Sequence, residues 1–233
     1  MMALIGTLLR GGVRWACRLI VGWLVVCGGL IVLFRWVPVP FTAVMLEQAI
    51  MSRSRWQHQW VPYERISDSV KLAVIASEDQ RFPWHYGFDT QQMHNAWEAW
   101  LEGRSLRGAS TISQQTAKNV LLWRHSDWAR KGLEVPLTGM IELSWSKQRI
   151  LEVYLNSAEW DDGVYGIEAA ARHYFHVSAQ ALTVDQAIRL VAVLPAPRVW
   201  SPVHPDARVQ QRMRWIAAQM ALMGGKRFLH TLE

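Results

Sequence analysis

The sequence predicts a mainly α-helical protein, because apolar residues recur at helical spacing along most of the chain. Val70–Ala76 is a continuous apolar run, and Arg149–Leu155 places its apolar side chains three and four positions apart, on one face of a helix. Two further segments begin with a threonine that is followed three positions later by a glutamine, which is the spacing of a capping box: Thr111 with Gln114, and Thr183 with Gln186. Alternating strand patterns bounded by turns are almost absent, so helices are expected to account for the fold.

An uncharged segment near the N-terminus has the character of a membrane anchor. Leu19–Phe34 contains no charged residue across sixteen positions. A helix of that length spans about 24 Å, and Arg18 and Arg35 can extend toward the two interfaces of a hydrocarbon core about 30 Å thick. A cleaved signal peptide and a buried core helix are the alternatives, although no small-residue cleavage site follows and three glycines would weaken the helix in water. We therefore predict a single transmembrane helix over 19–36.

The distribution of charge predicts the topology and argues against a body that binds nucleic acid. Residues 1–40 hold four arginines and no acid, so only 21 of the 25 basic side chains remain against all 19 acidic ones. Three of these arginines precede the apolar segment and one closely follows it, which places the N-terminus in the cytoplasm. The expected organisation is a short cytoplasmic segment over 1–18, the anchor, and one exported domain over 37–233. The two cysteines, Cys17 and Cys27, provide neither a disulfide framework nor a metal site.

Several tryptophans of the exported domain stand beside polar residues, among them Trp97, Trp123 and Trp128. Ordinary core and surface aromatics account for such a pattern. A face that touches the bilayer is the alternative, because indole rings are well placed at a membrane interface. A tethered enzyme with such a face would act on a substrate carried by a lipid.

Glu78 and Asp79 form the first segment that could carry chemistry. Both acids follow directly on the apolar run 70–76. Burial against that run would favour the protonated form of a carboxyl group, which is one way in which an acid is tuned for proton transfer. The alternative is a pair of acids that ends a helix in solvent.

Residues 107–119, which read RGASTISQQTAKN, form a candidate site for an anion. The hydroxyl residues stand where the first amides of a helix lack partners, and Gly108 frees the backbone before them. Lys118 lies two turns into that helix and can bind a phosphate as a point charge. An ordinary capped helix is the alternative.

Three later segments indicate structure rather than chemistry when each is considered alone. Arg130–Glu134 and Lys147–Asn156 have the pattern of solvated helix faces, and 163–175 that of a close-packed turn and helix. The sequence contains no HExxH, CxxC, GxSxG or P-loop motif. His173 and His176 form an isolated pair at the surface rather than a set of metal ligands.

Taken in order, the five segments resemble the motifs of glycosyltransferase family 51, the peptidoglycan glycosyltransferases. The matching stretches are EDQRFPWHYGFD (78–89), RGASTISQQTAKN (107–119), RKGLE (130–134), KQRILEVYLN (147–156) and GVYGIEAAARHYF (163–175). The resemblance implies a lysozyme-like, mainly helical fold and an enzyme that polymerises lipid II into β-1,4-linked glycan strands, with inversion and release of undecaprenyl pyrophosphate. The anchor and the lack of a transpeptidase domain favour the monofunctional branch of the family.

The resemblance also implies roles for individual residues. Glu78 matches the catalytic base that takes the proton of the acceptor 4-hydroxyl. Glu134 matches a second essential carboxylate, which lies near the donor pyrophosphate and a divalent metal ion, Mg²⁺ or Mn²⁺. Lys118 matches the residue that neutralises the leaving pyrophosphate. The other substrate-binding residues expected from the resemblance are Ser110, Thr111, Gln114, Gln115, Arg124, Lys131 and Asn156.

Two positions depart from the family pattern. Ala109 stands where a glycine is often found, and Ser126 stands where many members carry an arginine, for which Arg124 is the candidate substitute. No organic cofactor is implied. The implied partners are lipid II, the growing glycan strand, membrane lipid and other proteins of cell-wall synthesis or division, with no nucleic acid.

The resemblance places the protein in the inner membrane, with the catalytic domain on the periplasmic face. Two other functions remain as alternatives. One is a lysozyme-type enzyme that cleaves peptidoglycan, since two carboxylates on such a fold also hydrolyse glycans. The other is an anchored cell-wall scaffold without catalytic activity.

Overall fold

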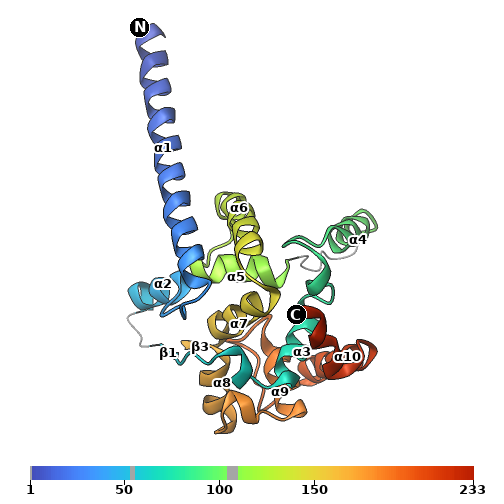
Figure 1. The fold of residues 1–233 in the computed structure, drawn as a ribbon. Helices are drawn as coiled ribbons and strands as arrows, with labels where there is room; N and C mark the ends of the chain where they lie inside the picture. Colours follow the sequence, from blue (N-terminus) through green and yellow to red (C-terminus); the bar gives the residue numbers. More distant parts are fainter. Residues whose placement is uncertain (1, 53–55, 104–109) are drawn as a thin grey trace.

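The computed structural model describes residues 2–52, 56–103 and 110–233 of the chain. A long N-terminal helix projects from a body built almost entirely of helices, which confirms the predicted class (Figure 1). The helices are α1 (Met2–Phe34), α2 (Ala43–Ser52), α3 (Asp68–Glu78), α4 (Thr90–Leu101), α5 (Ile112–Leu121), α6 (Trp128–Ser144), α7 (Lys147–Ser157), α8 (Ile167–Phe175), α9 (Val184–Val193) and α10 (Ala207–Leu222). The 3-10 turns are η1 (Tyr63–Arg65), η2 (Phe82–Trp84), η3 (Ala179–Ala181) and η4 (Gly225–Leu232).

Helix α1 is longer than the predicted anchor and is joined firmly to the body at its C-terminal end. It includes most of the segment expected to precede the anchor, and it ends at Phe34. Ile31 is buried in the main core, and its carbonyl accepts a hydrogen bond of 2.7 Å from the indole of Trp145. The Arg149 guanidinium donates to the Phe34 carbonyl at 2.8 Å.

The membrane-spanning character of 19–36 stays a prediction. Among the residues described, no helix is both long enough and apolar enough to cross a membrane. The alternative of a buried core helix applies only to one side of the last turns, where Cys27 and Ile31 are buried. Leu19 and Val25, by contrast, have exposed side chains.

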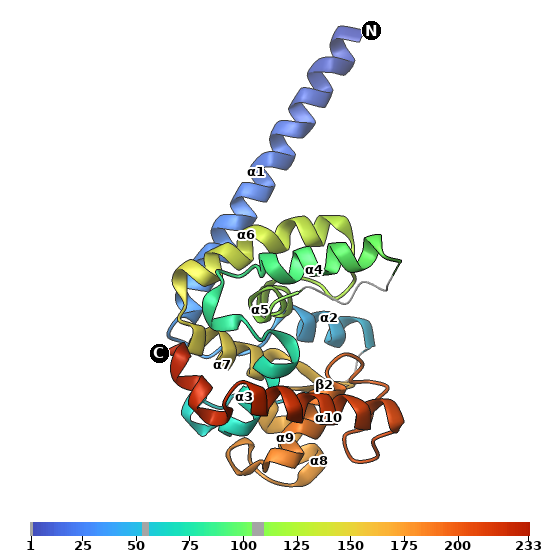
Figure 2. The same ribbon diagram turned by 90° about the vertical axis from the view of Figure 1, so that its right-hand side faces the viewer.

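Helix α5 lies at the centre of the body and connects its two halves. It packs against α6 on one side and α7 on the other, and α3 packs against α9 and α10 (Figures 1 and 2). Ile112 at the start of α5, Leu137 on α6 and Ile150 on α7 are all fully buried, as their apolar spacing requires. The residues of α5 are therefore held at fixed positions between the surrounding helices.

The start of α5 is fixed by side chains as well as by packing. The capping box predicted at Thr111 and Gln114 is present, and the Thr111 hydroxyl also donates to the Gly87 carbonyl at 2.6 Å. The buried carboxylate of Asp79 accepts hydrogen bonds from the Ile112 amide at 3.0 Å and from His85 Nε2 at 2.8 Å. The end of α3 is thereby joined to the start of α5. The capping box at Thr183 is also present, at the start of α9.

The sequence did not predict the small sheet. Its strands are β1 (Gln57–His58), β2 (Glu159–Asp161) and β3 (Val164–Tyr165), in the order β1-β3-β2. β1 runs parallel to β3, and β2 runs antiparallel to it. Strands of two or three residues are too short to show an alternating pattern, so only the tertiary structure reveals them.

Gly166 joins β3 to α8 in a conformation that suits glycine alone. Its φ is +83°, and an added Cβ would lie 2.9 Å from the Asn156 carbonyl oxygen. We expect Gly166→Ala to lower the free energy of unfolding by about 1–3 kcal/mol, because strain and a backbone clash add together. Denaturant unfolding of the detergent-solubilised protein measures the effect.

The matched control is Gly139→Ala in the interior of α6, where no described atom lies within 4 Å of the added Cβ apart from its chain neighbours and the adjacent backbone of the same helix. Alanine is favoured over glycine inside a helix by roughly 0.5–1 kcal/mol, so this variant should be as stable as the parent protein or more stable. Equal losses of stability in the two variants would contradict the assignment of strain to Gly166.

Candidate active site

Glu78 ends α3, and its carboxylate is held by side chains from two other elements as well as by its neighbour. Oε1 accepts hydrogen bonds from the Ser77 hydroxyl at 2.9 Å and from the Arg212 guanidinium, also at 2.9 Å. Oε2 accepts one from the Gln115 amide at 3.2 Å. The side chain is 16% exposed. The pair Glu78–Asp79 is therefore not a solvated helix end: Asp79 fixes the fold, and Glu78 has an ordered carboxylate that solvent still reaches.

Gln115 connects Glu78 to the interior through Tyr154. The hydroxyl of Tyr154 donates to Gln115 Oε1 at 3.3 Å, so the amide nitrogen of Gln115 is the atom turned toward Glu78. Burial raises the pKa of Tyr154 well above its usual value, and the negative charge of Glu78 acts in the same direction. The tyrosine therefore remains a protonated donor at every physiological pH.

A pocket of about 300 Å³ lies beside this chain of contacts, between α5, the β2 strand and the segment that follows α9. Gln115 and Lys118 both line it. They are three positions apart on α5, so they share a face and are separated by about 4.5 Å along the helix axis. Other lining residues come from distant parts of the chain: Arg124, Tyr154, Glu159 and Tyr165.

Lys118 is a half-buried cation on the wall of this pocket. Burial lowers the pKa of Lys118, and the positive charge of Arg130 lowers it further, while the nearby carboxylate of Glu134 opposes the shift. Lys131 and Arg124 add smaller repulsions. Several positive charges are therefore concentrated around one lysine, an arrangement that an anionic ligand would stabilise.

Glu134 lies on α6 and is 2% exposed. Its Oε2 accepts a 2.5 Å bond from the buried Arg130, and its Oε1 a 2.8 Å bond from Lys131. The interpretation of RKGLE as a solvated helix face was wrong, because the pattern allows either face and the packing of α6 against α5 turns Arg130 and Glu134 inward. Glu134 thus organises two cations close to Lys118.

The expectation that Glu134 helps to bind a divalent metal ion stays a prediction. Mg²⁺ is octahedral and usually takes its oxygen ligands from several waters, one or two carboxylates and the phosphates of a substrate. Both oxygens of Glu134 already pair with cations, and the described part of the chain contains no group of three His, Cys, Asp or Glu side chains that could hold a metal.

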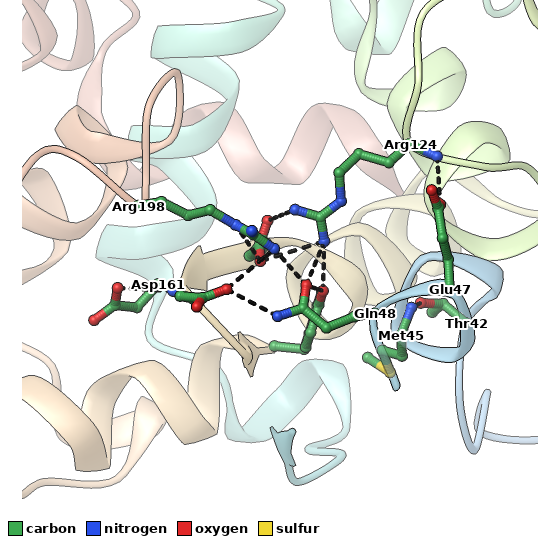
Figure 3. Close-up of polar contacts among 10 residues, drawn as sticks. Thr42, Met45, Glu47, Gln48, Arg124, Asp161 and Arg198 are labelled. Carbon is green, nitrogen blue, oxygen red and sulfur yellow. Dashed lines mark hydrogen bonds and ion pairs between the residues drawn. The ribbon is translucent and has the colours of Figure 1, made fainter. Parts of the chain in front are cut away.

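Arg124 belongs to an ion-pair network on the wall of the pocket (Figure 3). Its guanidinium donates to Glu159 at 2.7 Å, to Gln48 at 2.9 Å and to the Tyr165 hydroxyl at 2.7 Å. Arg198 reaches the same Glu159 carboxylate at 2.8 Å, from the segment after α9. Burial raises the pKa of Tyr165 to about 12, with a further contribution from Glu159, so its hydroxyl stays protonated. Arg124 therefore lines the pocket, but its charge is already paired with Glu159.

The remaining residues predicted from the sequence have mainly structural contacts. Thr111 and Gln114 form the capping box of α5, and Ser110 precedes it as a half-buried residue. Asn156 is fully buried and its side-chain amide bonds to the Val61 backbone, so it holds the chain rather than lining the pocket. Gly108 and Ala109 lie outside the described residues.

The residues near the site that lie outside the predicted set include the charged residues Arg212, Glu159 and Arg198. Glu159 stands between the fourth and fifth motifs, and the two arginines stand after the fifth. A charge on a helical surface gives no local signal of its partner, so Arg212 could not have been found from the pattern. The structure thus brings together Glu78, Gln115 and Lys118 from two predicted segments, and adds partners that only the fold supplies.

An ordered, partly exposed carboxylate lies next to a pocket in which positive charge is concentrated, an arrangement that suits an enzyme acting on an anionic substrate. A family model described as Transglycosylase matches residues 45–221. A biosynthetic peptidoglycan transglycosylase of Chromohalobacter salexigens is 52% identical, with 96% of this chain and 98% of that protein covered. Proteins of the same name from Pseudomonas fluorescens strains SBW25 and Pf0-1 are 52% and 53% identical, over 92% and 88% of this chain and 92% and 87% of theirs.

The chain belongs to the transglycosylase family, and it is a glycosyltransferase. The family predicted from the five ordered motifs is therefore confirmed, and the lysozyme-type alternative is not favoured.

From the lowered pKa of Lys118 we predict how the folding stability of the protein depends on pH. Between that lowered value and the ordinary 10.5, the unfolded chain binds more protons than the folded one, so stability rises with pH across this window. At neutral pH the charged lysine therefore destabilises the fold. We expect Lys118→Met to raise the melting temperature at pH 7, and the gain to shrink as the pH rises through the window.

Thermal melting at several pH values measures this effect. The control is Lys226→Met, at an exposed position in η4, which should leave the melting temperature nearly unchanged at every pH. A lower melting temperature for Lys118→Met at pH 7 would contradict the prediction, because it would show that Glu134 compensates the charge of the lysine fully.

Proposed function

We propose that this protein polymerises lipid II into β-1,4-linked glycan strands and releases undecaprenyl pyrophosphate, as a peptidoglycan glycosyltransferase of cell-wall synthesis. One observation carries the proposal: Gln115, which binds Glu78, and Lys118, which is surrounded by cations, lie one turn apart on the same face of α5. Sugar transfer from a diphosphate carrier needs a base at one end of the site and positive charge at the other. The relatives named as biosynthetic peptidoglycan transglycosylases support the same reaction.

In this mechanism Glu78 takes the proton of the acceptor 4-hydroxyl. The oxygen attacks the anomeric carbon of the donor as the bond from that carbon to the diphosphate breaks, and the bonding electron pair leaves with the diphosphate. Attack from the face opposite the leaving group inverts the anomeric configuration. Glu78 is suited to the role because its carboxylate is ordered by three donors and is still partly exposed.

The charge that develops on the diphosphate is met by Lys118 and the cations around it. A diphosphate is a good leaving group once its charge is stabilised, so it requires cations more than a proton donor. Glu134 keeps Arg130 and Lys131 in place for this purpose through its two short ion pairs.

The state of Glu134 also favours transfer over glycan cleavage. A glycosidase needs a second carboxyl group that acts as an acid, a nucleophile or a base at the scissile bond. Glu134 is buried, and both of its oxygens are paired with cations, so it is poorly placed to exchange protons with a substrate.

We also propose that residues 19–36 anchor the protein in the inner membrane, with 1–18 in the cytoplasm and 37–233 as the catalytic domain on the periplasmic face. The uncharged run, the arginines before it and the exposed apolar side chains of Leu19, Val25 and Val26 support this assignment. At least half of the surface is exposed in Trp97 and Trp100 on α4 and in Trp128 on α6. These exposed indoles support a face that meets membrane lipid.

Glu78→Gln tests the reaction most directly. The amide keeps the shape of the carboxylate and cannot accept the proton, so polymerisation of lipid II should slow by about 10² to 10⁴, with the loss in kcat rather than KM. Glu134→Gln should also slow the reaction, because it removes the charge that holds Arg130 and Lys131. A lipid II polymerisation assay on detergent-solubilised protein measures both effects.

Each variant has a matched control. Glu64→Gln changes an exposed acid in η1, and Asp185→Asn changes an exposed acid that pairs with an arginine four residues further along its helix. Both controls should polymerise lipid II at the rate of the parent protein. A well-folded Glu78→Gln variant that polymerises within a few-fold of the parent would remove Glu78 from the role of base, and a parent protein that shortens glycan strands without lipid II would favour cleavage.

The topology is tested by a reporter fused after Glu233. An enzyme that is active only on the exported side should show activity there, because the arginine distribution places the N-terminus in the cytoplasm. A strictly cytoplasmic reporter should be inactive at the same position. The reverse pattern would overturn the proposed orientation.

A further inference from the structure

Arg212 on α10 contacts Glu78, although it lies outside every predicted motif. The same guanidinium nitrogen donates to Glu78 Oε1 at 2.9 Å and to the Ser77 hydroxyl at 2.6 Å. Ser77 in turn donates to the same oxygen of Glu78 at 2.9 Å. These three residues form a closed triangle of contacts around one carboxylate oxygen.

Helix α10 is well fixed where it presents this arginine. It packs against α3 and α9, with Val209, Ile216 and Met220 buried on its inner face. A second polar contact joins α10 to the segment that directly follows α3, since the Gln80 amide donates to Gln219 at 3.1 Å. The Nε atom of Arg212 is buried and has no hydrogen-bond partner among the described residues, so the contacts with Ser77 and Glu78 orient the guanidinium.

The two oxygens of Glu78 are unequally occupied. Among the residues described, Oε1 accepts two hydrogen bonds, and Oε2 accepts one, from Gln115 on the side of α5 and the pocket. A carboxylate offers about four lone-pair positions. Oε2 is therefore the oxygen with capacity for a further proton on the side where a substrate would lie.

We propose that Arg212 is a positioning residue for the base. It fixes Oε1 of Glu78 against the α3–α10 interface and thereby turns Oε2 toward the acceptor hydroxyl. This inference rests on the proposed function, because it needs Glu78 to act as the base. Small misplacements of a reacting group cost large factors in rate, so an anchor for the carboxylate acts on the chemical step and not on substrate binding.

The test compares Arg212→Ala with Arg212→Lys and with Arg214→Ala, an exposed arginine on the same helix. For Arg212→Ala we expect kcat for lipid II polymerisation to fall about tenfold or more, with KM changed by less than about threefold. Arg212→Lys should recover part of the loss, since an ammonium can still reach Glu78 or Ser77. Arg214→Ala should behave as the parent protein.

A double-mutant cycle separates positioning from a merely structural effect. If Arg212 acts through Glu78, Arg212→Ala should slow the parent protein strongly and the Glu78→Gln variant hardly at all. Thermal melting of each preparation shows which variants are folded. If the Arg212→Ala variant melts below the assay temperature, Arg212→Gln takes its place in the cycle, and the same result is expected.

Three results would overturn the inference: a kcat for Arg212→Ala equal to that of Arg214→Ala, a defect confined to KM, or an equal loss in the Glu78→Gln background. Each of these three results is distinguishable from failure of the proposed function. If the proposed function were wrong, the parent protein itself would not polymerise lipid II, or the Glu78→Gln variant would polymerise it at the parent rate.

Discussion

The arrangement of the site depends on the buried carboxylate of Asp79. It accepts hydrogen bonds from the first amide of α5 and from His85, so it fixes the end of α3 to the start of α5. The preceding residue, Glu78, and the residues one turn into α5 are thereby held in register. A buried carboxylate without these donors would be costly, which makes the junction well defined. Two adjacent acids thus have separate tasks, one in the fold and one at the site.

Carboxylates also organise the positive charges near the pocket. Glu134 holds Arg130 and Lys131, and Glu159 holds Arg124 and Arg198. Each acid limits the repulsion between cations that the fold brings close together. No ion pair as close as these is found for Lys118 among the described residues. Burial lowers its pKa, and the positive charge of Arg130 lowers it further. An anionic group that enters the pocket would therefore interact most favourably at Lys118.

The connection between α1 and the body gives the site a defined position relative to the N-terminal helix. The last turns of α1 pack on α6, the helix that carries Glu134, and they are held by Trp145 and Arg149. A flexible linker would leave the body free to rotate about the helix. In this protein the backbone carbonyls at the end of α1 accept hydrogen bonds from the body, which join the helix to the part of the chain that carries the site.

The sequence by itself determined the helical class, the two capping boxes, the family, and the segments that supply Glu78, Lys118 and Glu134. These features are local: a hydroxyl residue satisfies helix amides within three positions, and an ordered set of motifs persists whatever the surroundings. Only the tertiary structure decided that Arg130 and Glu134 face inward, that Asn156 supports the backbone, that Arg124 pairs with Glu159, and that Arg212 reaches Glu78 from α10. A charged side chain on a helix can face solvent or pair with a buried partner. Which of the two occurs depends on which helix packs over it, and that helix is often too distant in the sequence for a local pattern to predict.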